Sequence, residues 1–447
     1  MEREKLGSRL GFILLSAGCA IGCGNVWKFP WMCGQYGGGA FVLIYLLVLV
    51  VMGLPVMIME FSVGRASRAS VLTCYQKLEK PGQKWHWHGA AAFMGNVLLM
   101  MFYTSVAGWI LYYFVSFVKG DMTGITNQAS SQLFGNMLQN VPVMVGFMAI
   151  VVVLGFIILS FSLQKGLERI TKYMMVLMLI LMVILAIRGF WLGGAKEGLT
   201  FYLKPSLSKI NGNVIVGAMN QSFFTLSLGI GSMAIFGSYI DKDRSLMGES
   251  INILVLDTFV ALIAGLIIFP ACFTFDIEAG AGPSLLFESM AMVFNNMAGG
   301  RIWGSLFFLF MTFASFSTVI AVFENIMSSC MDTLGWSRKK AALINGIVIL
   351  TASIPCVLGY NLWSNVHLIG GRDILDTEDF IVSNILLPLG SLIYLLFCVT
   401  KFGWGFDNYR KEANTGKGLK VAKWMKWYFL IVLPILILAI FIIGIIG

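Results

Sequence analysis

Charged residues are scarce in this chain of 447 residues: Asp, Glu, Lys and Arg make up 12% of it, whereas hydrophobic residues make up 58%. The mean hydropathy is +0.84. A water-soluble domain of this length needs a more highly charged surface, so the composition excludes a soluble globular protein. The sequence predicts instead an all-α polytopic membrane protein that lies in a lipid bilayer.

Histidine is rare, with three residues, and the eight cysteines follow no regular spacing. The cysteines are interpreted as small core residues and not as a disulfide framework. His86 and His88 suggest a metal site, but without further ligands nearby we interpret them as part of an interfacial aromatic cluster in a loop. An intramembrane enzyme needs a nucleophile beside a base or a His-rich metal site. The sequence therefore predicts no enzyme and no organic cofactor.

Acidic residues are fewer than basic ones, which gives a formal net charge of +9. Most Lys and Arg residues fall in alternate loops between apolar segments, as the positive-inside rule requires when the amino terminus is cytoplasmic. This distribution makes a nucleic-acid partner unnecessary. We expect a multi-pass protein of the plasma (inner) membrane with a cytoplasmic amino terminus.

Apolar segments of spanning length are abundant. A bilayer crossing needs about 20 apolar residues in a helix. About eleven segments meet this requirement, near residues 10–34, 39–62, 90–118, 141–162, 167–190, 212–240, 249–275, 301–333, 338–357, 378–400 and 425–446. Together they form a single transmembrane domain over residues 1–447.

The first segment contains features that interrupt a helix. Gly18, Gly22 and Gly24 weaken a helix within it, and Asn25 and Lys28 place polar groups in the same apolar run. Close packing between helices is one explanation of the glycines. Polar residues at membrane depth are costly unless they are used, so we favour a break that lines a binding site.

The sixth segment repeats this pattern, since hydroxyl residues and two glycines interrupt residues 221–232 near its middle. Interrupted spans five positions apart predict two halves of opposite orientation, a 5+5 inverted repeat with interrupted helices 1 and 6. We place the first repeat at residues 1–190, the second at 212–400 and an extra helix at 425–446. This pattern is typical of secondary transporters with a site at the membrane midplane.

Several polar residues in other spans have two interpretations. Glu60 either extends toward water or accepts a hydrogen bond from a broken helix. Asp257 lies within an apolar run and needs a cation or a donor. Ser315, Ser317 and Thr318 either coordinate a hard cation or bond back to their own helix.

Four motifs carry a resemblance to a known family. They are Arg9-Leu10-Gly11, residues 22–30 (GCGNVWKFP), residues 37–41 (GGGAF) and residues 223–229 (FFTLSLG). The chain closely resembles the neurotransmitter:sodium symporter family, in particular its bacterial amino-acid transporters of the leucine and tyrosine type. Its eleven expected spans depart from the family's usual twelve.

The resemblance implies a substrate site. The substrate carboxylate would meet the amides of Cys23 and Gly24 and the Tyr103 hydroxyl. The amine would face carbonyls of Ala20, Phe224 and Thr225 and the Ser227 hydroxyl. Monoamine carriers of the family have Asp where this chain has Gly22, so the ligand should bring its own carboxylate. Further lining positions would be Cys19, Leu99, Phe224, Ile230, Thr318 and Val322.

The resemblance also implies two sodium sites. One would lie between Ala20, Asn25, Thr225 and Asp257, and the other between Gly18, Ile21, Ala314, Ser317 and Thr318. Many relatives have Asn in place of Asp257, and chloride-dependent relatives bind an anion close by. A carboxylate at this position would supply that negative charge, so we expect chloride-independent transport.

Gates are implied on both sides of the membrane. Lys28 stands where relatives commonly have Arg, and it would pair with Asp379 across the external mouth. Lys lacks the bidentate fork of Arg, so this gate should be weaker. The inner latch of the family matches Arg3, Ser238, Tyr239 and Asp332, although Leu6 replaces the usual Trp.

The expected function is sodium-coupled import, by alternating access, of a neutral amino acid that is hydrophobic or aromatic. Ile230 replaces an aromatic wall of leucine-type relatives, which leaves room for a large side chain. The alternative is an amino-acid-gated sodium-permeable channel or a membrane receptor. We expect a monomer or a weak homodimer.

Overall fold

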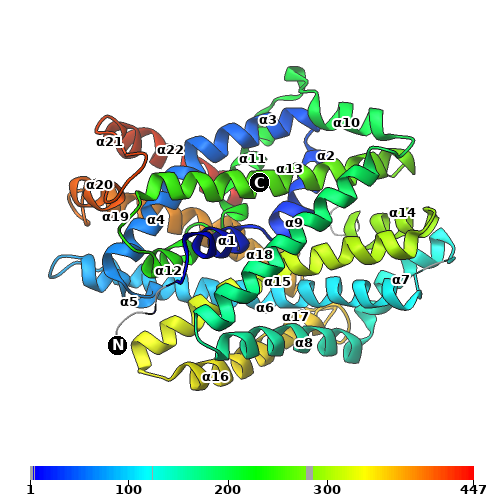
Figure 1. Ribbon diagram of the computed structural model, residues 1–447, viewed down its shortest axis with the longest axis horizontal. Coiled ribbons are helices and arrows are strands. Elements are labelled where there is room, and N and C mark those ends of the chain that lie inside the picture. Colours follow the sequence, from blue (N-terminus) through cyan, green and yellow to red (C-terminus); the bar gives the residue numbers. More distant parts are fainter. Residues whose placement is uncertain (1–3, 5, 123, 278–284, 447) are drawn as a thin grey trace.

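The protein is a bundle of helices in the computed structural model, which describes residues 4, 6–122, 124–277 and 285–446. Most of the long helices run along the longest axis of the molecule, which is horizontal in Figure 1. The described residues form helices and their connections, with one isolated parallel bridge between Arg244 and Lys417.

The helices follow one another along the chain with short connections. The α-helices are α1 (Arg9–Ala20), α2 (Phe29–Gln35), α3 (Gly39–Val48), α4 (Leu54–Ser67), α5 (Val71–Leu78), α6 (His86–Lys119), α7 (Asn127–Gln139), α8 (Val141–Ser160), α9 (Arg169–Gly189), α10 (Ala195–Leu203), α11 (Gly212–Thr225), α12 (Ser232–Tyr239), α13 (Leu246–Thr274), α14 (Met290–Asn296), α15 (Gly300–Leu334), α16 (Arg338–Ala352), α17 (Ile354–Leu358), α18 (Ile374–Phe380), α19 (Leu387–Val399), α20 (Phe406–Ala413), α21 (Met425–Trp427) and α22 (Leu433–Ile446). Several π-helical turns, such as Gly24–Lys28 and Ile381–Leu386, join consecutive helices into longer spans.

The eleven predicted spans correspond to observed helices. In the described part of the chain, nine helices are long and apolar enough to cross a membrane, and α1 with Gly24–Gln35 forms a tenth span that bends by 55°. The remaining span consists of α11 and α12, two short helices separated by residues 226–231. The fold is therefore all-α and polytopic, with spans one and six interrupted as the sequence predicts.

The two interruptions have a clear local origin. Residue Ile21 leaves the helical conformation with ψ 103° at the end of α1. Between α11 and α12, Ser227, Gly229 and Gly231 have φ values of 50°, 95° and 75°. A positive φ at three positions within five residues cannot continue a right-handed helix, so the backbone groups of this linker must find other partners.

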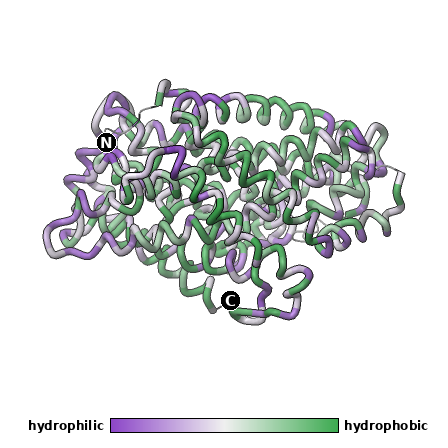
Figure 2. The backbone as a smooth tube through the Cα atoms, turned by 90° about the horizontal axis from the view of Figure 1, so that it is seen from below, coloured by the Kyte–Doolittle hydropathy of each residue, from purple (hydrophilic) through white to green (hydrophobic). Residues whose placement is uncertain are grey.

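Polar residues gather at the two ends of the bundle, whereas hydrophobic residues fill the band between them (Figure 2). We call the end at which α1 begins the N-terminal side; it carries α5, α12 and α20 (Figure 1). The opposite side carries α7, α10 and α14. In the interior, α6 and α15 pack along each other and form the scaffold against which spans one and six lie.

The prediction that His86 and His88 lie in a loop is wrong. Both residues belong to the first turn of α6, and His88 is buried. Its ring contacts Tyr75 and Tyr394 edge-on, at centroid distances of 5.3 and 5.1 Å. The local sequence does not reveal that α5 and α19 cover the start of α6, so it could not predict the burial of His88.

Candidate functional site

A small cavity lies between the two interrupted spans. It is bounded by the break in span one, the linker of span six, and the scaffold helices α6 and α15. Eight residues predicted to bind substrate or sodium line it: Ala20, Gly24, Leu99, Tyr103, Phe224, Ser227, Ile230 and Thr318. Gly22 also lines the cavity, and a Cβ atom at this position would lie 2.3 Å from Thr318 Oγ1 and 2.5 Å from Tyr103 Oη. Only glycine therefore leaves the cavity open here.

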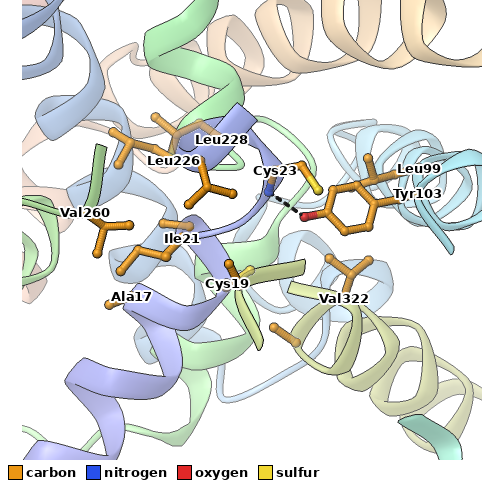
Figure 3. Packing of buried hydrophobic residues seen from close by; sticks show 14 of the residues in the cluster. Ala17, Cys19, Ile21, Cys23, Leu99, Tyr103, Leu226, Leu228, Val260 and Val322 are labelled. Atoms are coloured by element: carbon orange, nitrogen blue, oxygen red, sulfur yellow. Dashed lines mark hydrogen bonds between the residues drawn. The ribbon is translucent and has the colours of Figure 1, made fainter. Parts of the chain in front are cut away.

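Tyr103 connects the scaffold to the break in span one. The amide of Cys23 donates a hydrogen bond of 2.9 Å to the Tyr103 hydroxyl oxygen. Figure 3 shows this bond, with Leu99 beside Tyr103 on the same helix and with Cys19 and Val322 nearby. An amide freed by the helix break and a phenol thus meet at one point, which is an arrangement suited to an anionic group.

A buried carboxylate lies beside the break. Asn25 Nδ2 donates to Asp257 Oδ1 at 2.8 Å, and Thr225 Oγ1 lies 3.5 Å from the same oxygen. Asp257 is fully buried, and its second oxygen, Oδ2, has no hydrogen-bond partner among the described residues. A buried anionic oxygen without a partner is costly unless a cation meets it. Carboxylate and hydroxyl oxygens, as Asp257 and Thr225 supply here, are ligands that a hard cation such as sodium prefers.

A second cluster of oxygen atoms lies where α15 faces the end of α1. Thr318 Oγ1 lies 3.4 Å from Gly18 O and 3.2 Å from Ile21 O. Ser317 Oγ lies 3.2 Å from Ile21 O and 2.8 Å from Ala314 O. The five residues predicted for the second sodium site are therefore adjacent. By contrast, Ser315 bonds to Thr312 O of its own helix, at 3.1 Å, and does not join the cluster.

A wider cavity leads from the substrate cavity to the side opposite the N-terminus. Tyr103 and Phe224 line both cavities and so separate them. Lys28 Nζ lies 3.9 Å from Asp379 Oδ2 across the wider cavity and 3.8 Å from the centre of the Phe224 ring. The two residues predicted to form the outer gate therefore lie within ion-pair distance of each other.

Three residues of the predicted inner latch, Ser238, Tyr239 and Asp332, lie among the described residues, and each makes polar contacts. Tyr239 Oη donates to Glu324 Oε1 at 2.6 Å, and Arg338 pairs with the same carboxylate at 2.5 Å. Asp332 Oδ2 accepts from the amide of Ser70 at 2.7 Å. Ser238 O accepts from Arg68 at 3.2 Å. Arg3 lies outside the described residues.

Glu60 bonds to the broken helix, which decides between the two interpretations of this residue. It is fully buried and accepts hydrogen bonds from the amides of Gly229 and Met233. Donors freed by the linker of span six are thereby satisfied by span two.

Four expected substrate contacts are not among the residues that line this cavity, and two lining residues were not predicted. Cys23 lines the wider cavity, the Thr225 hydroxyl is directed to Asp257, and Cys19 and Val322 are buried. Val382 and Leu387 belong to span ten, which covers Ile374–Val399, and they complete the cavity wall. They are ordinary apolar residues of a spanning segment, so no sequence signal marks them, and only the packing of span ten against the linker brings them here.

Comparison with known proteins places this geometry in context. The sequence profile described as the sodium:neurotransmitter symporter family matches residues 3–132 and 128–447. The uncharacterized sodium-dependent transporter YhdH of Bacillus subtilis (strain 168) is 34% identical over 438 residues, which cover 97% of this chain and 96% of that protein. An uncharacterized sodium-dependent transporter of Haemophilus influenzae is 33% identical over 455 residues, covering 99% and 98%. The crystal structure of MhsT in complex with L-phenylalanine matches with a TM-score of 0.89 at 35% identity, covering 98% of this chain and 99% of that chain.

Proposed function

Because the chain belongs to the sodium:neurotransmitter symporter family, we propose that it couples the entry of sodium to the import of a neutral, hydrophobic or aromatic amino acid. The observation that carries this proposal is the buried Asp257 oxygen beside the break in span one, which has no hydrogen-bond partner among the described residues. Sodium ions and one zwitterion would together satisfy the polar groups that the two helix breaks leave without helical hydrogen bonds.

The substrate carboxylate would take the place at the Cys23 amide and the Tyr103 hydroxyl, and the amine would face the carbonyls of Ala20, Phe224 and Thr225. Gly22 supports a ligand that brings its own carboxylate, since this position has no room for an acidic side chain. The apolar wall formed by Leu99 and Ile230 supports a hydrophobic side chain on the ligand.

Sodium would enter as a co-transported substrate at two places. The first ion would lie at Asp257, Asn25, Thr225 and Ala20, and the second at the oxygen cluster of Ser317 and Thr318. Each monovalent cation that moves inward gains about 2.3 kcal/mol per 100 mV of membrane potential. Two ions per zwitterion would therefore support accumulation against a steep gradient.

The N-terminal side would be cytoplasmic, in agreement with the distribution of Lys and Arg. Import would begin at the wider cavity beside Lys28 and Asp379. Spans one, two, six and seven would then move against the scaffold and release the substrates near Tyr239 and Glu324.

Uptake into proteoliposomes tests the proposal. With sodium outside, we expect saturable uptake of L-phenylalanine that stops when the sodium gradient is collapsed and that persists when gluconate replaces chloride. Uptake that requires chloride would contradict chloride independence alone. Conductance that does not saturate with the amino acid would favour the channel, and binding without any flux would favour the receptor.

A further inference from the structure

Two side chains of the scaffold helix α6 hold the linker that interrupts span six. His88 Nε2 lies 3.1 Å from Gly229 O. Two turns further along the same helix, Asn96 Nδ2 lies 2.7 Å from Ile230 O. Because a carbonyl oxygen only accepts hydrogen bonds, both side chains donate, and His88 carries a proton on Nε2. The helix α6 thus donates to two consecutive carbonyls between the end of α11 and the start of α12.

Further contacts fix both donors in position. His88 Nδ1 lies 2.8 Å from the Tyr75 hydroxyl. Asn96 Oδ1 accepts from Asn325 Nδ2 at 3.1 Å, and the Asn96 amide also donates to Ala92 O at 2.7 Å. Both side chains are buried among neighbours from α5, α15 and α19, so neither has freedom to follow a displaced linker.

The linker is enclosed on its other faces as well. The Gly229 amide donates to Glu60 of span two while its carbonyl accepts from His88. A Cβ atom at Gly229 would lie 2.2 Å from Leu387 O, and one at Gly390 would lie 2.0 Å from Gly229 O. Span ten therefore approaches the linker backbone directly. The peptide groups at Gly229 therefore bond both to span two and to the scaffold helix α6.

The held carbonyl belongs to a residue of the cavity wall. Ile230 lines the substrate cavity, and a Cβ atom at Gly95 would lie 3.1 Å from Ile230 Cγ2. The same stretch of α6 therefore holds the backbone of Ile230 and leaves room for its side chain. A shift of this backbone would move the wall that contacts the substrate side chain.

We propose that His88 and Asn96 are positioning residues that fix the linker of span six, and that they thereby set the affinity for the amino acid and the selectivity for its side chain. The effect on binding rests on the proposed function. Neither residue lines the cavity, so each acts through Gly229 or Ile230.

Substitution of each donor by leucine, which has no polar group, tests this role in the full-length protein. For His88→Leu and Asn96→Leu we expect sodium-dependent binding of L-phenylalanine to weaken about tenfold, because each change leaves a buried carbonyl without its donor. The preference for L-phenylalanine over L-valine should also fall, because Ile230 in the cavity wall is no longer held in place. The conservative His88→Gln retains a donor near Nε2 and should restore both affinity and preference to within about twofold.

The matched control is Thr104→Val on the same helix. Thr104 is buried and bonds to Met100 O and to Ser353, so its loss removes a scaffold hydrogen bond without touching the linker. Thr104→Val should lower thermal stability but leave affinity and preference unchanged. Unaltered binding in His88→Leu and Asn96→Leu, or an equal loss in Thr104→Val or His88→Gln, would overturn the proposal.

Hydrogen exchange separates this proposal from the proposed function. Without any ligand, the amides of residues 226–231 should exchange at least tenfold faster in His88→Leu and Asn96→Leu than in the unaltered protein or Thr104→Val. If the unaltered protein binds no amino acid, the proposed function fails, and the exchange rates alone decide whether these residues hold the linker. Equal exchange in all variants overturns the proposal.

Discussion

At the scale of single residues, Ser317 and Ser315 form a natural comparison. Both are buried on α15, but Ser317 faces Ile21 O and Ser315 bonds within its own helix. Removing the Ser317 hydroxyl deletes one expected sodium ligand. We therefore predict that Ser317→Ala raises the sodium concentration for half-maximal uptake about tenfold, whereas Ser315→Ala leaves it unchanged. Equal sodium dependence in the two variants would remove Ser317 from the site.

Asp257 provides the charge at the other expected sodium site. Asp257→Asn retains the shape of the side chain and removes the negative charge, so a cation beside it loses its strongest ligand. Sodium affinity should fall by about tenfold or more, or uptake should become dependent on chloride. Sodium titration of uptake with and without chloride measures both outcomes. The control is Asp407→Asn on the exposed face of α20, for which we expect no change.

At the scale of elements, helix α20 is tied to span two by a buried ion pair. Arg65 is fully buried, and its Nε lies 2.7 Å from Glu412 Oε1. Removal of one charge from a buried pair leaves the other charge uncompensated. Glu412→Gln should therefore destabilise the protein by about 3 kcal/mol, which thermal unfolding in detergent measures.

The comparison for Glu412→Gln is Asp241→Asn. Asp241 pairs with Arg68 at 3.5 Å on an exposed surface, and such pairs contribute about 1 kcal/mol or less. The two acids lie on the same side of the bundle and undergo the same chemical change. A similar loss of stability in both variants would show that burial of Arg65 does not govern the effect.

The sequence predicts where a helix is interrupted better than it predicts which residues contact the interruption. The interruption at Gly229 is predictable because glycine and hydroxyl residues stand inside an apolar run, a local property. The partner of the Gly229 carbonyl is not predictable, since His88 lies 141 positions away and only tertiary packing brings it there. Val382 and Leu387 escaped prediction for the same reason. The oxygen cluster at Ser317 followed from a family resemblance, because adjacent hydroxyls alone equally favour bonds within the helix.

At the scale of the whole molecule, the contact between Lys28 and Asp379 should follow the transport cycle. A bifunctional thiol cross-linker that joins Lys28→Cys to Asp379→Cys would fix the wider cavity in one arrangement. We predict that cross-linking abolishes uptake while amino acid bound beforehand stays trapped, since the outer route is closed. The controls are Lys28→Cys alone and Asp379→Cys alone, each treated in the same way. Uptake that survives cross-linking would argue against alternating access.

All eight cysteines are free and buried. Alkylation of a native thiol can therefore report on water access without an introduced cysteine. Cys23 lines the wider cavity directly at the break in span one, and under the proposed alternating access water would reach it while that route is open. The rate at which a small alkylating agent modifies Cys23 should therefore record how long the molecule spends open to that side. Slower modification of Cys23 in the presence of sodium and amino acid would show, in the unmutated protein, that bound substrates close this route.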